Sequence, residues 1–256
     1  MAASEQAERT GGVQSVTRAF QVLEAMAESD GRISLSALAT ACDLPLPTIH
    51  RLVRTLTDLG YVRQEPSRQY ALGPKLIRLG ESASRLLGTW ARPHLAELVD
   101  TLGETANLAM LDGDRVVYVG QVPSRHSMRM FTEVGRKVYA HCTAVGKVLL
   151  ANLPAEQVQE ILRRTGMPAQ TEHTITDPER FAEELDRIRE RGYATDDGEQ
   201  EVGVRCVAVA VPGGPAQMAI SISGPVTRMT DELVARAVPL LQKAAAALAA
   251  DLTQRS

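Results

Sequence analysis

The residues best able to do chemistry lie near the end of the chain, in two apolar segments on either side of a turn rich in proline and glycine. These segments predict a β-hairpin over Val204–Val211 and Ala216–Ser223. In the expected register, Cys206 lies opposite Ser221, and Ser223 follows two residues along the same strand. Directly opposed residues of a hairpin share a face. One thiol and two hydroxyls are therefore expected to project together from an apolar surface.

A buried polar cluster of this kind needs hydrogen-bond partners. A small polar ligand would supply them, and so would ordered water, so a binding pocket and a structural cluster are both open interpretations. The acidic segment Asp196–Glu201 directly precedes the hairpin and is expected to form a loop. One of its carboxylates, turned inward, would accept a hydrogen bond from a ligand hydroxyl, whereas a solvated loop is the ordinary alternative.

A third candidate element is the segment His141–Lys147, which is typical of a turn that enters a helix. The free N–H groups in the first turn of a helix suit a carboxylate ligand. An ordinary capped helix start is the alternative. Elsewhere in the chain, the arginine-bearing segment Arg125–Arg136 is either a lid over a pocket that attracts an anion or a surface loop.

A second kind of chemistry is indicated by another expected helix, whose first turn contains Pro45 and Pro47. Proline is tolerated in the first turn of a helix. Its polar face comprises Thr48, Arg51, Arg54, Thr55 and Asp58, with His50 at its edge. Arginine can donate two parallel hydrogen bonds to a guanine edge or hold a phosphate. A threonine at the helix N-terminus can donate to a phosphate, helped by free backbone amides. The alternative is a solvated basic face on an ordinary helical hairpin.

The residues after this helix favour the nucleic-acid interpretation. Gly60 ends the helix, and two short strands, Tyr61–Gln64 and Gln69–Leu72, are predicted on either side of a turn. This pattern is typical of a wing. Arg63 and Arg68 would then lie over a phosphate backbone or a minor groove.

Two further helices are needed to position this face. The first is expected over Val13–Ser29, and Ser34 is expected to cap the second. The expected inward residues of the first helix are Val16, Ala19, Phe20, Leu23 and Met26. The expected buried stripe of the third helix is Ile49, Leu52, Val53, Leu56 and Leu59. The order of helix, helix, turn, helix and wing predicts a winged helix-turn-helix.

The remaining chain predicts a linker helix and a mixed second domain. A helix over Pro74–Leu87 presents small and apolar positions that suit pairing with a second copy or packing on its own head. Helices are then expected at 93–103, 145–151, 154–165, 177–192 and 230–252, and a hairpin at 105–111 and 115–122. Mixed strands with flanking helices define an α+β, sensor-like domain.

Composition narrows the class of protein. The chain has 256 residues, which suits two domains, and its 44% hydrophobic content is typical of globular proteins. The net charge is −3, but residues 13–85 carry a small excess of basic residues, which favours a sequence-specific DNA reader over a non-specific one. Three widely spaced cysteines fit a reducing cytoplasm. The first twelve residues lack a signal core, and no apolar run predicts a membrane span.

Two other functions compete with a DNA-binding sensor. An enzyme fused to a DNA-binding head would need a base beside Cys206, and nothing in the sequence places His126 or His141 there. A zinc-dependent sensor has ligand types in those histidines, in His173 and in Cys142, but no paired Cys or His spacing of the structural-zinc kind. We therefore expect no catalytic residues, no metal and no cofactor.

Several separate segments resemble the IclR family of bacterial transcriptional regulators, along nearly the whole chain. In the head they are GVQSVTRAFQVLEAM, IHRLVRTLTDLGYV and YALGPKLIRLG; in the second domain they are HCTAVGKVLLA, TITDP, RGYATDDGEQEVGVRCVAV and ISISGP. The order of these motifs makes the resemblance more specific than any one of them. It implies a GAF-like effector domain, a homodimer or dimer of dimers, and palindromic operator DNA.

The resemblance also implies roles for particular residues. Pocket groups for a small carboxylate fall at Asp196, Cys206, Ser221 and Ser223, with backbone donors at Ala144 and Val145. The expected domains are a tail at 1–12, a winged helix-turn-helix at 13–73, a linker helix at 74–89 and an effector domain at 90–256. The expected function is that of a cytoplasmic repressor that binds operator DNA and senses an organic acid, with no membrane partner.

Overall fold

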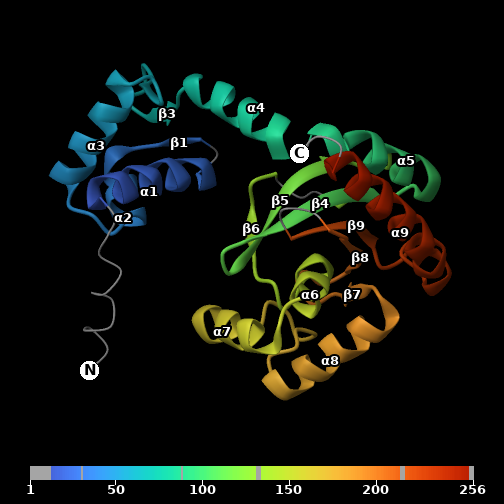
Figure 1. Cartoon of the computed structure of the whole chain (residues 1–256). Coiled ribbons are helices and arrows are strands. Elements are labelled where there is room, and N and C mark those ends of the chain that lie inside the picture. Colours follow the sequence, from blue (N-terminus) through green and yellow to red (C-terminus); the bar gives the residue numbers. More distant parts are fainter. Residues whose placement is uncertain (1–12, 30, 88, 131–133, 214–216, 254–256) are drawn as a thin grey trace. The chain divides into compact units, whose positions relative to one another are not determined.

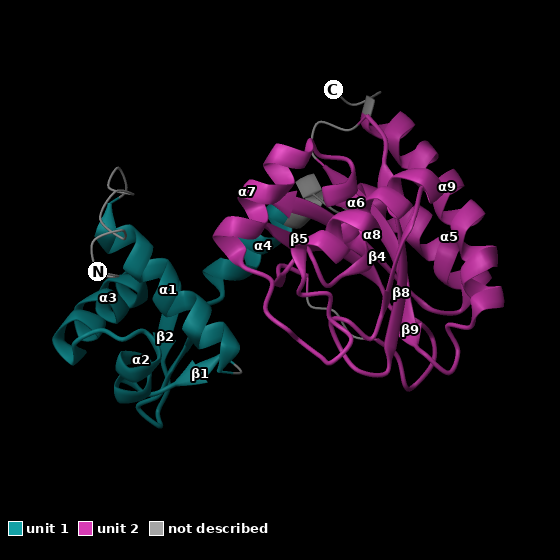
Figure 2. Ribbon diagram, turned by 90° about the horizontal axis from the view of Figure 1, so that it is seen from below, with its two compact units in different colours: residues 1–83 teal, residues 84–256 magenta. Residues whose placement is uncertain are grey.

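The computed structural model describes residues 13–253 except 30, 88, 131–133 and 214–216. The chain divides into two compact units, Met1–Ala83 and Ser84–Ser256 (Figure 2). Each unit has its own hydrophobic core. The division falls within helix α4 (Lys75–Leu87), which corresponds to the predicted linker helix. The architecture is mixed α+β, as predicted.

The first unit is a winged helix-turn-helix (Figure 1). Its helices are α1 (Gln14–Glu28), α2 (Leu35–Ala41) and α3 (Leu46–Asp58), and its antiparallel strands β1 (Arg32–Ile33), β2 (Val62–Gln64) and β3 (Tyr70–Leu72) have the order β1-β3-β2. Ser34 caps α2, because its hydroxyl oxygen accepts from the Ala37 N–H at 3.2 Å. Gly60, whose φ of +81° is left-handed, follows the end of α3 and lets the chain turn into the wing.

The core of the first unit differs from the prediction on one face of α1. Val22 and Met26 are fully buried, whereas Val16 and Phe20, expected to point inward, are 52% and 60% exposed. Three predicted inward residues are confirmed, since Met26 is buried and Ala19 and Leu23 pack partly buried against the core. Val16 and Phe20 lie at the edge of the predicted stripe, on the side that the core does not cover. Leu59, which directly follows α3, is likewise 50% exposed and not part of the buried stripe. These exposed apolar residues lie along one groove, described below.

The second unit contains one six-stranded antiparallel sheet between two layers of helices (Figure 1). The strand order is β6-β5-β4-β9-β8-β7. The strands are β4 (Thr105–Asp112), β5 (Arg115–Val122), β6 (Lys137–Val138), β7 (Ala194–Asp197), β8 (Val204–Val211) and β9 (Met218–Pro225). A short 3-10 turn, Thr89–Ala91, precedes the first helix of the sheet domain within this unit.

The two faces of the sheet have separate cores. Helices α5 (Arg92–Leu102) and α9 (Asp231–Thr253) pack on one face, through residues such as Leu98 and Leu241. Helices α6 (Ala144–Ala151), α7 (Ala155–Thr165) and α8 (Pro178–Arg191) form the core of the other face. By length and composition alone, Asp231–Leu252 could cross a membrane. Its residues Ala237, Leu241 and Leu248 are fully buried in the core of this domain, and 28% of the apolar stretch is buried in all.

Two features of the last hairpin differ from the sequence prediction. Cys206 lies opposite Ser223, and Ala208 opposite Ser221, so the true register is shifted by two residues. The reason is a longer connection, since β9 begins at Met218 instead of Ala216. A shift of two residues leaves every side chain on its predicted face.

The acidic segment also differs from the prediction, because Asp196 and Asp197 end strand β7 instead of lying in a loop. Aspartate is depleted in strands, so the local sequence conceals this one. Only the following residues, from Gly198 onward, form the loop into β8. The carboxylate of Asp196 is consequently held by a strand and not by a loop.

Candidate functional site

Three of the predicted polar residues lie together on the sheet face that α6 covers. Cys206 on β8 pairs with Ser223 on β9, and Ser221 lies at the next position on the same face. All three are almost completely buried. The expected convergence of one thiol and two hydroxyls on an apolar face is confirmed.

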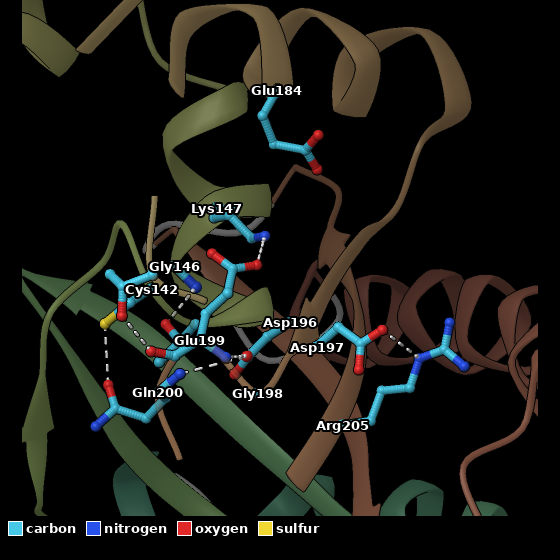
Figure 3. A network of polar contacts seen from close by, with 12 residues as sticks. Cys142, Gly146, Lys147, Glu184, Asp196, Asp197, Gly198, Glu199, Gln200 and Arg205 are labelled. Carbon is cyan, nitrogen blue, oxygen red and sulfur yellow. Dashed lines mark hydrogen bonds and ion pairs between the residues drawn. The ribbon is translucent and has the colours of Figure 1, made fainter. Parts of the chain in front are cut away.

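Asp196 completes this group from the neighbouring strand, where it lies opposite Cys206. Its Oδ1 accepts hydrogen bonds from the backbone N–H groups of Glu199 at 2.7 Å and Gln200 at 3.4 Å (Figure 3). Burial raises the pKa of Asp196 to about 7, although the Glu199 N–H and the nearby Lys147 charge act in the opposite direction. Near neutral pH this carboxyl therefore exists in both charge states.

A buried ion pair lies beside Asp196. Lys147 of α6 donates to Glu199 Oε1, and both side chains are buried (Figure 3). The other oxygen, Glu199 Oε2, has no partner among the described residues. Burial raises the pKa of Glu199, while the charge of Lys147 lowers it. Sequence reasoning considered Glu199 only as one of the carboxylates of the acidic segment and did not predict its pairing with Lys147, since nothing local shows that positions 147 and 199 meet.

The start of α6 faces the same region. The Thr143 hydroxyl oxygen caps the helix by accepting from the Gly146 N–H at 3.1 Å. Position 146 requires glycine, because a Cβ at this position would lie 2.2 Å from the Ala140 carbonyl oxygen. The N–H groups of Ala144 and Val145 belong to the first turn, where no intrahelical acceptor exists. The first turn of α6 and the polar side chains of the sheet thus lie on the same side of the sheet, and a helix N-terminus is a favourable place for an anion.

The thiols near this group are not activated nucleophiles. Burial raises the pKa of Cys142 to about 12, and its Sγ donates to Gln200 Oε1 at 3.0 Å. Burial also raises the pKa of Cys206 well above its usual value. A catalytic thiol needs the opposite shift, so the arrangement favours binding over covalent chemistry. Among the described residues, no three His, Cys, Asp or Glu side chains are grouped closely enough to hold a metal ion.

Sequence reasoning missed two further polar residues of this face. Asn107 on β4 is fully buried, and its Nδ2 donates to Ser221 Oγ at 3.4 Å and to Ser223 Oγ at 3.2 Å. Gln121 on β5 donates from Nε2 to Asn107 Oδ1 at 3.0 Å. The available signal was an asparagine inside an otherwise apolar strand, since asparagine is depleted in strands.

The predicted DNA-reading residues occupy the exposed side of α3 and the wing. His50, Arg51, Arg54 and Thr55 are exposed, and Thr48 is half-buried at the helix start. The Thr55 hydroxyl donates to the Arg51 carbonyl oxygen at 3.0 Å. In the wing, Arg63 pairs with Glu65 at 3.3 Å, which leaves its side chain 58% exposed. Arg68 adopts a left-handed φ of +63° in the wing turn.

Comparison with known proteins agrees with this architecture. Residues 15–66 match the IclR helix-turn-helix domain, and residues 83–250 match the bacterial transcriptional regulator IclR C-terminal domain. The transcriptional repressor IclR of Escherichia coli K12 is 39% identical, over 92% of this chain and 89% of that protein. The regulator KdgR of the same organism is 35% identical, over 98% and 97%.

Solved structures show the same fold. The IclR regulator of Alicyclobacillus acidocaldarius has a TM-score of 0.83 at 32% identity, covering 93% of this chain and 98% of that one. An IclR homologue from Microbacterium hydrocarbonoxydans, solved with 4-hydroxybenzoate, has a TM-score of 0.80 at 24% identity, covering 94% and 99%. The fold and its matches define a DNA-binding transcriptional regulator with a C-terminal effector domain. The chain belongs to the IclR family of bacterial transcriptional regulators.

Proposed function

We propose that this protein is a repressor that binds palindromic operator DNA and is controlled by a small organic acid bound in its second unit. The observation that carries the proposal is the buried group of Asp196, Cys206, Ser221 and Ser223 under the start of α6. Polar groups gathered inside an apolar layer are typical of small-molecule sites. The α6 amides of Ala144 and Val145 supply donors for a carboxylate.

Operator recognition is assigned to the exposed side of α3 and to the wing. The proposed contacts are Thr48, His50, Arg51, Arg54 and Thr55 on α3, and Arg63 and Arg68 on the wing. Helix α3 corresponds to the recognition helix, whose side chains reach base edges in the major groove. The wing arginines would contact phosphates or the minor groove, which positions the head without reading sequence.

The working form is proposed to be a homodimer or a dimer of dimers in the cytoplasm, with no membrane partner. A groove of about 580 Å³ in the first unit is lined mainly by apolar residues, including Phe20 of α1, Leu79 of α4 and Leu59 just after α3, and also by Arg51 and Thr55 of α3. Each of the three apolar side chains is at least half exposed. A second copy is the occupant that fits, because a palindrome needs two heads related by a two-fold axis.

The organic acid would act by binding one dimer arrangement more tightly than another. A ligand shifts such an equilibrium only through its difference in affinity for the two states. Of the family relatives, the Microbacterium hydrocarbonoxydans homologue holds 4-hydroxybenzoate, a hydroxy acid. Glyoxylate is a second candidate, by the family resemblance.

The replacement Arg51→Ala tests the division of labour between the units. An operator is first selected from random duplex DNA with the intact protein. The variant should lose about 10- to 100-fold in operator affinity, because one bidentate contact contributes about 1–3 kcal/mol of discrimination. Acid-induced stabilisation of the second unit should be unchanged. Arg180→Ala, an exposed arginine on α8, is the matched control and should preserve both activities. Loss of both activities in Arg51→Ala would contradict the proposal.

A further inference from the structure

A row of four polar side chains crosses three strands of the sheet. Asn107 on β4 lies opposite Gln121 of β5 on one side and opposite Ser221 of β9 on the other. Ser223 follows two positions along β9, on the same face. The row therefore runs from Gln121, which is partly exposed, through Asn107 to the two buried serines. It reaches the proposed effector pocket from the side away from Asp196.

The hydrogen bonds in this row have a defined direction. Gln121 Nε2 donates to Asn107 Oδ1, so the oxygen of the asparagine amide points toward Gln121. The Nδ2 group then points toward the serines and donates to both oxygens. An amide NH₂ has two hydrogens, and each serine uses one of them. Each hydroxyl accepts from Asn107 and keeps its own hydrogen to donate elsewhere.

We propose that Gln121 and Asn107 are positioning residues that hold the Ser221 and Ser223 hydroxyls as donors toward the effector. The effector then presents an acceptor to the sheet, a carboxylate or carbonyl oxygen. The inference deepens the proposed function and rests on it. Cys206 does not need to accept a hydrogen bond from the Ser223 hydroxyl, because a protonated thiol is itself a weak donor.

Gln121 is needed because the oxygen and nitrogen ends of the Asn107 amide have nearly the same shape. Shape alone therefore does not fix which end faces the serines. A half-turn of that amide would place Oδ1 against the serines, and their hydroxyls would then donate to it instead of to the ligand. The same half-turn would place two N–H donors, from Gln121 and Asn107, against each other. With its Nε2 facing Asn107 as the structure shows, Gln121 therefore favours the orientation that leaves the serine hydrogens available, without touching the ligand itself.

The test is the isosteric replacement Gln121→Glu, which puts an acceptor-only carboxylate against Asn107 Oδ1 and favours the half-turn. The probe is whichever of acetate, glyoxylate and 4-hydroxybenzoate binds the wild-type full-length chain most tightly by calorimetry. Gln121→Glu should weaken its binding at least about tenfold, the effect of roughly one lost hydrogen bond to a charged group. Gln121→Met, a neutral variant of similar length, should lose clearly less.

A double-mutant cycle separates this effect from simple repulsion between the introduced carboxylate and an anionic probe. In an Asn107→Ala background no amide is present to turn, so Gln121→Glu should cause no further loss of affinity. An equal loss in both backgrounds would overturn the inference, as would wild-type affinity in Gln121→Glu. If the wild-type protein binds none of the three acids, the proposed function itself fails and this inference fails with it. Thermal unfolding of every variant verifies that the second unit is folded.

Discussion

Asp196 is the residue whose ionisation should be visible in the stability of the second unit. Its pKa is about 7 in the folded chain against an ordinary value of 3.8, so folding favours the protonated form. The folded state then binds more protons than the unfolded state between these values, and stability falls as pH rises through about 7. Asp196→Asn removes the charge and should be more stable than wild type at pH 8, by at most about 4 kcal/mol.

The advantage of Asp196→Asn should shrink toward pH 4, where the folded-state carboxyl is neutral and the unfolded-state carboxyl is close to its own pKa. Urea unfolding followed by the fluorescence of Trp90, the single tryptophan and part of the second unit, measures it. Asp186→Asn, the same replacement at an exposed position on α8, is the control. Identical pH profiles for the two variants would contradict the account of Asp196.

At the scale of single residues, the sequence predicted which side chains of one hairpin lie together. It did not predict contacts between residues that are far apart in the chain. Cys206, Ser221 and Ser223 lie on one face because alternation along strands is local. Asn107 meets Ser221 only after residues 114 positions apart in the chain become neighbours. A single sequence contains no local pattern that reports such a meeting.

At the scale of elements, the Lys147–Glu199 pair connects α6 to the loop after β7. Removing one partner leaves a buried charge without compensation, which typically costs about 3–5 kcal/mol. Lys147→Met and Glu199→Leu should each destabilise the second unit by about this amount. The double variant should be far more stable than the sum predicts, since two apolar side chains need no compensation. Trp90 fluorescence in urea tests this, and simple additivity would contradict it.

Most helices and strands were predictable because their periodicity is local, as in α8 with its Asp177 cap and left-handed Gly192. Strand β5 was predicted over its full length, Arg115–Val122. Strand β7 was missed, because Asp196 and Asp197 disfavour strands and only pairing with β8 holds them there. The predicted β8–β9 register was wrong, because the length of a connection is set by tertiary packing and not by its proline and glycine content alone.

At the scale of the whole molecule, the exposed apolar groove of the first unit predicts how operator binding depends on dimerisation. Leu79 lies on α4, lines this groove and is 53% exposed. Leu79→Glu would place a charge in the proposed interface, where burial without a partner is unfavourable. Two linked heads gain affinity through effective concentration, so the variant should bind a palindromic operator at least about tenfold more weakly.

The same variant should keep most of its affinity for a single half-site, because Leu79 is not itself a proposed DNA contact, although Arg51 and Thr55 line the same groove. Acid-induced stabilisation of the second unit should be unchanged, since that unit has its own core. Val202→Glu, an exposed apolar position of the second unit at 66% exposure, is the matched control and should bind the palindrome normally. Wild-type affinity of Leu79→Glu for the palindrome would show that the heads pair through another surface. A matching loss on the half-site would mean that Leu79 supports the head itself and not its pairing.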